Sequence, residues 1–510
     1  MAIFTYTNIT ISLISLFLAR RVYWEVTTGS RRRALSSHHA CQPPKGISIW
    51  TTCFGLKEVL SDLRAVRTKK ILSNWANTLR SNNTHTFLSG PLTMKVFHTD
   101  DPENIKAVLA TNFQTWGMPR GRVSEMTSLF GHAIFTNEGA AWKHSREMLR
   151  PCFERSQVAD VSLLAKHVNS LIRVVPMDGS TVDLQPLFFE FTLDVASEFL
   201  FGRSTGWLDR EERGCDEDAS AFVEAFEYCM NPYMSENFKK YGILGFVLPD
   251  GKRKRFAKLI RDFANKLVEK RISAKATEPS QSENRHTFLD ELLASTQNRT
   301  TISSELLHLL LAGRDTTASL LSNLLWELPR HPAILSRLRQ EITEHIGDET
   351  PTYEQLKSLK YLRAIINESQ RIYPIVPANS REALTDTILP RGGGPDGTSP
   401  VLVPKGSYVN YYTHAMHHRT DVYGADADEF KPERWLDPGF RPGWAYIPFS
   451  GGPRVCIGQN FALTEVSFVV VRLLQMFDVE QRDFGEWKEK VGFTCTGYGG
   501  CKVGLKRRVG

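Results

Sequence analysis

One cysteine of this 510-residue chain stands in a glycine-rich turn, Cys456 in "FSGGPRVCIG" at residues 449 to 458. The other seven cysteines are scattered, and none of the eight forms a CxxC pair of the kind that zinc sites and thioredoxin-like centres use. Sparse, unpaired cysteines indicate a reducing compartment, in which most thiols serve as small apolar core residues. A turn built around a single thiol marks Cys456 as the exception, a thiol with chemistry to perform.

A second candidate site is "AGRDTT" at residues 312 to 317, in the middle of an apolar stretch that is typical of a long buried helix. Ala312 and Gly313 would let a flat or bulky ligand approach the backbone closely, whereas Asp315 and Thr316 are costly to bury without a task or a partner. A helix kink, with the threonine hydroxyls bonded back to the preceding turn, explains the same residues equally well. This motif alone does not decide between a ligand site and a kink.

Three further motifs pair charged or aromatic side chains. "ESQR" places Glu368 and Arg371 three residues apart on one helix face, and the loop "FKPERW" carries Arg434, a second guanidinium for the same carboxylate. "WKHSR" sets Trp142 and Arg146 one helical turn apart. Each motif by itself is typical of solvated surface pairs, so the specific signal is their order along the chain.

Together with the cysteine turn, these motifs resemble the cytochrome P450 family over essentially everything after the N-terminus. The matching residues fall into three sets: the haem loop (Phe449, Gly452, Arg454, Cys456, Gly458), the oxygen-binding helix (Ala312, Gly313, Asp315, Thr316, Thr317) and the structural triad (Glu368, Arg371, Arg434). The resemblance implies a haem-thiolate monooxygenase with haem b as its cofactor.

The resemblance also implies a role for each residue around the sulfur. Cys456 would bind the haem iron as a thiolate, which favours cleavage of the oxygen–oxygen bond. Gly452 and Gly458 would permit a tight turn whose N–H groups point at the sulfur and control its basicity, and Phe449 would screen it from water.

Other matched residues are expected to hold the haem edge and to move protons. The expected partners of the haem propionates are Arg454, Arg146, Trp142 and Arg381, with His132 as a further candidate, and Ala312 is expected against the haem face. On the opposite side from Cys456, Thr316 would hydrogen-bond the oxygen and Asp315 would help to deliver protons as part of a relay.

Apolar periodicity of three and four residues predicts that helices position these groups. The helix that carries "AGRDTT" is expected to run from the Ser303–Ser304 cap to about Leu328, where Pro329 stops it. Strand-like alternation is local, as at residues 92 to 99 and 407 to 414. The fold class is therefore mainly α with small β-sheets, and the resemblance implies the cytochrome P450 fold behind an N-terminal transmembrane helix.

The N-terminus predicts that membrane anchor. Residues 2 to 19 carry no charge over 18 residues, about the minimum for a span, and arginines follow at 20, 21 and 31 to 33. Positive charge on that side keeps it cytosolic, whereas a cleaved signal peptide would carry its positive charge before the apolar stretch. We expect an anchor and proline hinge at 1–45, a catalytic domain at 46–510 facing the cytosol, and location in the endoplasmic reticulum membrane.

Most of the net charge of +7 belongs to this N-terminal segment, which holds six basic residues and one acidic residue. The rest of the chain is nearly neutral, which removes the main support for nucleic-acid binding. No flavin or nicotinamide fingerprint is present, since "GGGPDG" at 392 to 397 is a turn-rich insert without a helix behind it. The resemblance therefore implies electrons from NADPH–cytochrome P450 reductase, with cytochrome b5 as a second candidate donor.

Two readings from other classes stay open. A haem-thiolate isomerase or peroxide-using enzyme would need no reductase, although Asp315 and Thr316 argue against it, because such enzymes have less need of a proton relay. A membrane protein in which Cys456 is merely structural is the non-enzymatic alternative.

For the substrate, the insert "ILPRGGGPDGTSPVLVPKG" (388 to 406) and "CIGQNFALTE" resemble the fungal branch that hydroxylates n-alkanes and fatty acids. A long-chain aliphatic substrate is therefore expected, and the alternative is a tailoring oxygenase of fungal secondary metabolism acting on a polyketide- or lipid-derived intermediate. Two departures from the family pattern stand out: Gln370 replaces an apolar residue inside the Glu–Arg helix motif, and Asn379 and Ser380 are polar just before Arg381. The amide of Asn379 and the hydroxyl of Ser380 would either favour an oxygenated substrate or bond to nearby backbone. Substrate contacts are expected from residues 115–135, 226–238, 309–315, 376–380 and 495–500.

Overall fold

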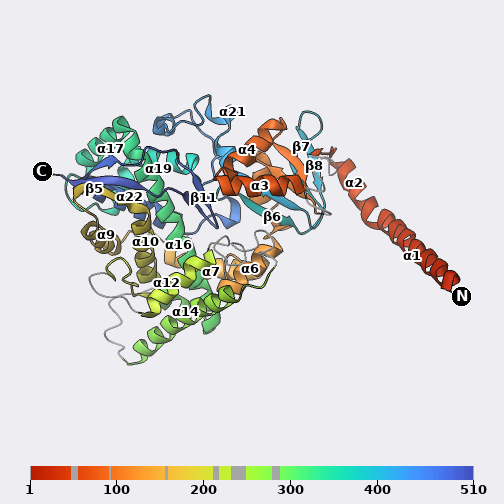
Figure 1. The fold of residues 1–510 in the computed structure, drawn as a ribbon, viewed down its shortest axis with the longest axis horizontal. Coiled ribbons are helices and arrows are strands. Elements are labelled where there is room, and N and C mark those ends of the chain that lie inside the picture. Colours follow the sequence, from red (N-terminus) through yellow and green to blue (C-terminus); the bar gives the residue numbers. More distant parts are fainter. Residues whose placement is uncertain are drawn as a thin grey trace.

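The computed structural model describes residues 2–46, 56–90, 94–154, 159–210, 217–230, 248–277 and 288–508. Helices make up most of this part of the chain, as the periodicity predicts (Figure 1). Their bounds are α1 (Ala2–Trp24), α2 (Ser30–His38), α3 (Leu56–Thr68), α4 (Ile71–Ser81), α5 (Pro102–Lys106), α6 (Arg120–Phe130), α7 (Gly139–Leu149), α9 (Ser162–Val174), α10 (Leu184–Phe201), α12 (Glu217–Met230), α14 (Gly251–Thr277), α15 (Phe288–Ser295), α16 (Arg299–Glu327), α17 (Pro332–His345), α18 (Tyr353–Ser358), α19 (Lys360–Ile372), α20 (Thr413–His417), α21 (Thr420–Tyr423) and α22 (Gln459–Met476).

The strands are short and form small sheets. The largest sheet has the order β1-β2-β3-β9-β6-β4, a second has the order β10-β13-β5, and β11-β12 and β7-β8 are hairpin pairs. Their bounds are β1 (Lys45–Gly46), β2 (Thr86–Ser89), β3 (Val96–Thr99), β4 (Trp116–Gly117), β5 (Asp178–Asp183), β6 (Asn379–Ala383), β7 (Thr387–Gly393), β8 (Ser399–Val403), β9 (Tyr408–Tyr411), β10 (Phe477–Gln481), β11 (Glu489–Val491), β12 (Cys495–Gly497) and β13 (Lys502–Arg507).

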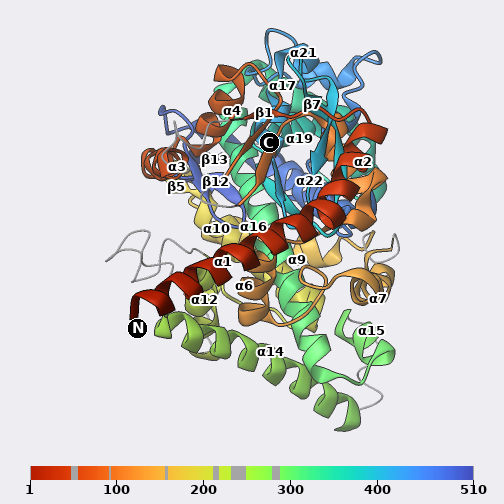
Figure 2. The same ribbon diagram turned by 90° about the vertical axis from the view of Figure 1, so that its right-hand side faces the viewer.

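The helix α16 crosses the middle of the molecule, between α10, α14 and α22 (Figures 1 and 2). Its leucines are buried on every side, and they join two apolar cores that meet at this helix. The predicted start at Ser303–Ser304 is wrong: the helix begins at Arg299, because the Asn298 side chain accepts the Thr301 N–H at 3.2 Å and caps the first turn. Its C-terminal end, before Pro329, is as predicted.

Two apolar runs with helical periodicity are each divided in the structure. The apolar run at 104–113 continues from α5 into a π-helical segment at Ala107–Thr111, and the run at 356–372 is broken at Leu359 between α18 and α19. The predicted strands at 92–99 and 407–414 contain β3 and β9, which pair in parallel. The insert at 388–406 forms the β7–β8 hairpin, again without a helix behind it.

At the N-terminus, α1 projects away from the body and α2 leads back to it (Figure 1). Its apolar side chains face outward, as shown by the exposure of 56% for Ile11, 67% for Leu16 and 68% for Phe17. Among the described residues, no helix combines enough length with enough apolar character to pass through a bilayer. The membrane anchor therefore stays a prediction.

Candidate active site

The loop before α22 holds Cys456 through its backbone. The Cys456 N–H donates a hydrogen bond to the carbonyl oxygen of Phe449 at 3.0 Å, which closes the turn. Gly452 has a φ of +66°, and a Cβ there would lie 1.9 Å from the carbonyl oxygen of Leu109. A side chain at Gly452 would therefore force the loop off its support, so the turn requires glycine.

The Cys456 thiol is accessible, unlike the buried thiols of Cys152, Cys229, Cys495 and Cys501. Protein atoms still surround it on most sides, and this desolvation raises the pKa of the Cys456 thiol. The Gly458 N–H, which hydrogen-bonds the sulfur, and the charge of Arg146 act in the opposite direction by favouring the thiolate. The loop thus presents one reachable sulfur whose anion has two stabilising neighbours.

One short face of α16 is open in an otherwise buried helix. From Ile302 to Glu327, every residue is buried except Ala312, Gly313 and Thr316. The Thr316 hydroxyl donates to the Ala312 carbonyl oxygen at 2.7 Å. The back-bonding expected of a kink is therefore present, but so is the small-residue opening expected of a ligand site. The helix itself is continuous through "AGRDTT".

Basic and aromatic side chains gather beside the cysteine loop. The Arg454 guanidinium lies 4.7 Å from the centroid of the Trp142 ring and donates to the carbonyl oxygen of Asn137 at 2.9 Å and to Glu138 Oε2 at 2.7 Å. Arg146 donates to the carbonyl oxygen of Val455 at 2.9 Å. Burial lowers the pKa of both arginines; for Arg454, the charges of Arg381 and Arg146 add to this effect and Glu138 opposes it.

Arg122, which the sequence analysis did not single out, adds another cation next to Arg381. Asn379 Oδ1 accepts hydrogen bonds from Arg122 at 2.7 Å and from Arg381 at 3.3 Å. Burial, followed by the charge of Arg381, lowers the pKa of Arg122 to about 10. Its position in the segment 115–135, already expected to line the pocket, is the only signal in the sequence that points to it.

This arrangement fits the haem that the resemblance implies. The accessible sulfur of Cys456 would hold the iron, the open face of Ala312 would take the flat ring, and the arginines with Trp142 would hold its propionates. A bound haem supplies the activation of dioxygen. The cations are charged, partly buried and close together, so two carboxylates would relieve their mutual repulsion. His132, by contrast, has an exposed side chain.

The predicted triad residues meet in the interior. Both Glu368 oxygens accept hydrogen bonds from Arg371 at 2.8 Å, and Glu368 Oε1 also accepts one from Arg434 at 3.0 Å. The Trp435 indole N–H and the Lys431 backbone N–H, each at 2.9 Å, complete the set. Glu368 and Arg371 have side chains with 0% exposure, so this cluster is structural rather than a surface pair.

Asp315 does not lie free on the open face of α16. It is 7% exposed, and its Oδ1 accepts a hydrogen bond from Arg314 at 3.0 Å. Desolvation raises the pKa of Asp315, while the Arg314 charge acts to lower it. The role of Asp315 in proton delivery, inferred from the motif, is not visible as a contact to Thr316.

A second carboxyl near this motif comes from α22. Burial raises the pKa of Glu465 to about 8, and the Thr317 hydroxyl hydrogen-bonds it. Glu465 is 2% exposed and is therefore held as a neutral acid between α22 and α16 at neutral pH. The sequence offered one signal for it, an isolated Glu within the apolar run "FALTEVSFVVV".

The residues expected to meet substrate are only partly described. Residues 231–238 of the predicted segment 226–238 lie outside the described residues. Asn379 Oδ1 is occupied by Arg122, by Arg381 and by the Ser380 N–H at 2.8 Å, which favours the local-bonding explanation for this amide. Gln370 is 3% exposed on α19 and therefore belongs to the interior.

This chain is similar to known proteins over most of its length. The family model described as Cytochrome P450 matches residues 59–495. Cytochrome P450 monooxygenase FPY7 of Fusarium mangiferae is 36% identical, over 98% of this chain and 96% of that protein. Cytochrome P450 52A3-B of Candida maltosa is 44% identical, over 76% of this chain and 77% of that protein. The crystal structure of the cytochrome P450DA heme domain superimposes with a TM-score of 0.73 at 20% identity, over 88% of this chain and 94% of that one, which shows a shared fold.

Proposed function

Because this chain belongs to the cytochrome P450 family and is a haem-dependent monooxygenase, we propose that it hydroxylates a long, largely aliphatic substrate of the alkane or fatty-acid type. The observation that carries the proposal is the pairing of one accessible thiol, Cys456, with one small-residue opening in a buried helix, at Ala312, Gly313 and Thr316. We expect the flat cofactor to bind between these two features, with an apolar substrate beside it.

The segment at 376–380 supports an aliphatic substrate with one polar end. Val376 and Ala378 are half-buried apolar residues, and the chain then becomes polar at Asn379, which contacts Arg122. A hydrocarbon body beside the apolar residues and an oxygenated end near Arg122 would match this change. The resemblance to the fungal n-alkane and fatty-acid hydroxylases points to the same substrate class.

A fungal tailoring oxygenase acting on a polyketide- or lipid-derived intermediate is the second candidate. Arg122 is the observation that bears on it, because its guanidinium hydrogen-bonds Asn379 and has no carboxylate partner among the hydrogen bonds of the described residues, whereas Arg381 is expected to meet a haem propionate. An acidic intermediate would supply that partner. A fatty acid would supply it as well, so ligand binding must distinguish the two.

On the oxygen side, we assign proton transfer to Thr316 and Asp315. Thr316 is the hydroxyl on the open face of α16, and Asp315 is the adjacent acid. For Thr316 to donate toward the pocket, its hydroxyl must turn away from the Ala312 carbonyl oxygen. The adjacent Thr317 is buried and hydrogen-bonds the carboxyl of Glu465.

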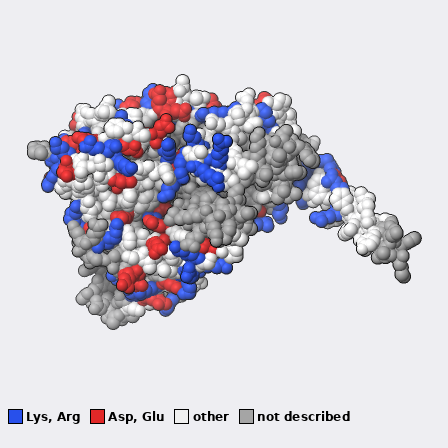
Figure 3. Space-filling view, in the orientation of Figure 1, with Lys and Arg blue, Asp and Glu red and all other residues white. Residues whose placement is uncertain are grey.

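We also propose that α1 anchors the enzyme in the endoplasmic reticulum membrane, with residues 1–45 as the anchor and hinge and 46–510 as a cytosolic catalytic domain. The outward-facing apolar residues of α1 support this proposal, as do the basic residues that lie where the projecting helix meets the body (Figure 3). Arg32 also reaches the body, where its Nε donates to Asp386 Oδ1 at 3.0 Å.

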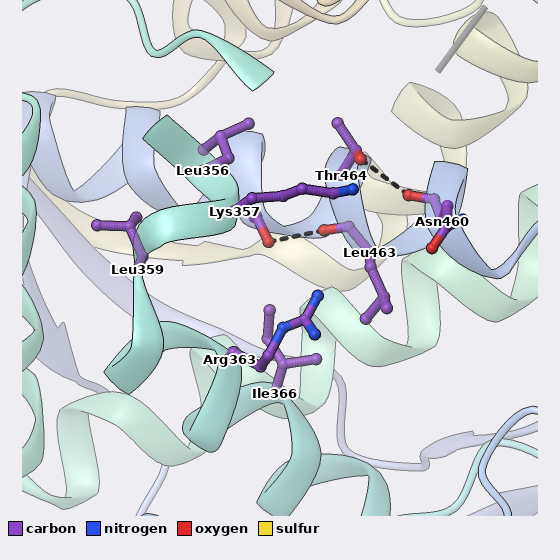
Figure 4. A pocket seen from close by; sticks show the side chains of 9 residues that line it. Leu356, Lys357, Leu359, Arg363, Ile366, Asn460, Leu463 and Thr464 are labelled. Atoms are coloured by element: carbon purple, nitrogen blue, oxygen red, sulfur yellow. Dashed lines mark hydrogen bonds between the residues drawn. The ribbon is translucent and has the colours of Figure 1, made fainter. Parts of the chain in front are cut away.

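Electrons would come from NADPH–cytochrome P450 reductase, with cytochrome b5 as a second donor. A groove of about 430 Å³, counted with its open mouth, lies between α18, α19 and α22, the helix that starts three residues after Cys456. Lys357 and Arg363 extend over this groove (Figure 4) and are exposed. Two cations close to the thiolate side would attract an acidic redox partner.

The test is ligand binding and turnover by the purified full-length enzyme. Alkanes, fatty acids and polyketide acids are titrated against the absorption spectrum, and the proposal expects a spin-state shift with the first two classes at the lowest concentrations. A shift with polyketide acids alone would select the tailoring oxygenase. Product formation that is equally fast without reductase and NADPH would contradict reductase-supported turnover and favour the isomerase or peroxide-using alternative.

A further inference from the structure

Arg314 lies between two carboxylates that differ in their access to solvent. Its Nη1 donates to Asp315 Oδ1 at 3.0 Å, and its Nη2 donates to Glu227 Oε1 on α12 at 2.9 Å. The Asp315 side chain is 9% exposed, whereas the Glu227 side chain is 58% exposed. One guanidinium therefore links the acid of the "AGRDTT" motif to a glutamate at the surface.

The guanidinium itself is held in place. Its central carbon lies 5.1 Å from the ring centroid of Phe189 and 5.5 Å from that of Phe226. The Thr192 hydroxyl donates to the Arg314 carbonyl oxygen at 2.8 Å and ties this turn of α16 to α10. The cation lies against two aromatic rings, which restrict its movement. Asp315 and Glu227 therefore compete for the charge of an Arg314 side chain that stays in place.

We propose that Glu227 is a positioning residue for Asp315. By partly neutralising Arg314, Glu227 weakens the hold of Arg314 on Asp315 and leaves the Asp315 carboxyl free to turn toward Thr316 and exchange protons. This inference rests on the proton-transfer role proposed above for Asp315.

The charges around Asp315 determine the direction of the effect. Arg314 and Lys490 favour its anion, while Glu227 opposes it. When Glu227 is removed, Asp315 is the one carboxylate partner that Arg314 keeps among the described residues, and the Asp315 anion is bound more tightly. Asp315 then releases from Arg314 and takes up a proton less often, so proton delivery slows.

The test compares Glu227→Gln with Glu224→Gln, a matched control one helical turn earlier on the same exposed face of α12. In Glu227→Gln, product formed per NADPH consumed should fall about threefold to tenfold, in the lower half of the coupling energies seen within one hydrogen-bonded network, and the solvent deuterium isotope effect should rise. Glu224→Gln should match the wild type. Glu227→Asp, which retains the charge, should stay within about twofold of it.

A second readout does not depend on turnover. The infrared stretching frequency of carbon monoxide bound to the reduced enzyme falls when a donor lies near its oxygen atom. Glu227→Gln should raise this frequency because Asp315 is held away, and Glu224→Gln should leave it unchanged. In an Arg314→Gln background, where Asp315 is released, Glu227→Gln should have no further effect on either readout.

The outcomes separate this inference from the proposed function. If Asp315→Asn lowers the product yield per NADPH but Glu227→Gln does not, the positioning role is wrong and the proton-transfer role stands. If neither variant changes it, the relay itself is wrong and the inference falls with it. Effects of Glu227→Gln that persist in the Arg314→Gln background would also overturn the proposal, because Glu227 would then act by another route.

Discussion

Replacing Glu368 with Gln should strongly destabilise the fold without touching the pocket. Glu368 is the shared acceptor for Arg371, Arg434, the Trp435 indole and the Lys431 N–H. The amide of glutamine has one acceptor oxygen and no charge, so Arg371, with 0% exposure, would remain as a buried cation without a carboxylate.

The magnitude follows from that burial. Removing one partner of a buried ion pair costs about 3–5 kcal/mol, a large share of the roughly 5–15 kcal/mol that stabilises a typical domain. Arg371 retains bonds to the carbonyl oxygens of His417 at 2.9 Å and Glu429 at 3.0 Å, which place the cost near the lower end, about 3 kcal/mol. Burial alone would raise the pKa of Glu368, but the hydrogen bond and charge of Arg371 outweigh it and lower that pKa. The contribution of Glu368 to the free energy of unfolding is therefore complete above the unfolded-state pKa, about 4.3, and is lost as the pH falls through the lower folded-state pKa.

The assay is urea unfolding at pH 7, followed by loss of the absorption band of the reduced, carbon-monoxide-bound enzyme. The control is Glu147→Gln, which removes a surface pair with Lys143 at 3.7 Å and side-chain exposures of 72% and 65%, and should change the free energy of unfolding by less than about 0.5 kcal/mol. A Glu368→Gln protein that keeps its band and loses less than about 1 kcal/mol would refute the reasoning, because the buried cation would then cost almost nothing.

Three further outcomes are expected. Cys456→Ala should abolish the red-shifted thiolate band in folded protein, and a band that survives would remove Cys456 as the iron ligand. Glu465→Gln should become more stable relative to wild type as the pH rises from about 6 to 8, by up to about 1.4 kcal/mol per pH unit. The buried Glu465 carboxyl keeps its proton in the folded state up to a pKa of about 8, whereas the unfolded state releases that proton near pH 4.3, so wild type loses stability as the pH rises. A difference in urea midpoint between the two proteins that is the same at pH 6 and pH 8 would contradict this prediction. Lys357→Glu combined with Arg363→Glu should slow electron transfer from reductase about tenfold at low salt, as measured by stopped-flow reduction, and an unchanged rate would exclude the groove from docking.

The motifs predicted the constellation of the site because its chemistry restricts residue types at fixed spacing. A haem-thiolate site needs a cysteine, for which Cys456 is the candidate, and the turn that packs against Leu109 needs glycine at position 452, so both residues can be recognised in the linear chain. Helix periodicity predicted most helices for a similar reason, since burial on one face repeats every three to four residues. Helix boundaries were less predictable. The start of α16 depends on the cap formed by the Asn298 side chain, but Ser303 and Ser304 are also typical capping residues and were predicted as the cap instead.

The sequence by itself determined the family, the cofactor and the residue expected to bind it, because each depends on a local pattern. Only the tertiary structure decided which charges meet. Arg122 lies beside Arg381, Glu465 beside Thr317, and Glu227 across Arg314 from Asp315, and the two residues of each pair are separated by 88 to 259 positions in the chain. Their pKa values and contacts depend on burial and on distances that the folding of α6, α12 and α22 around α16 creates, and no spacing along the chain encodes them.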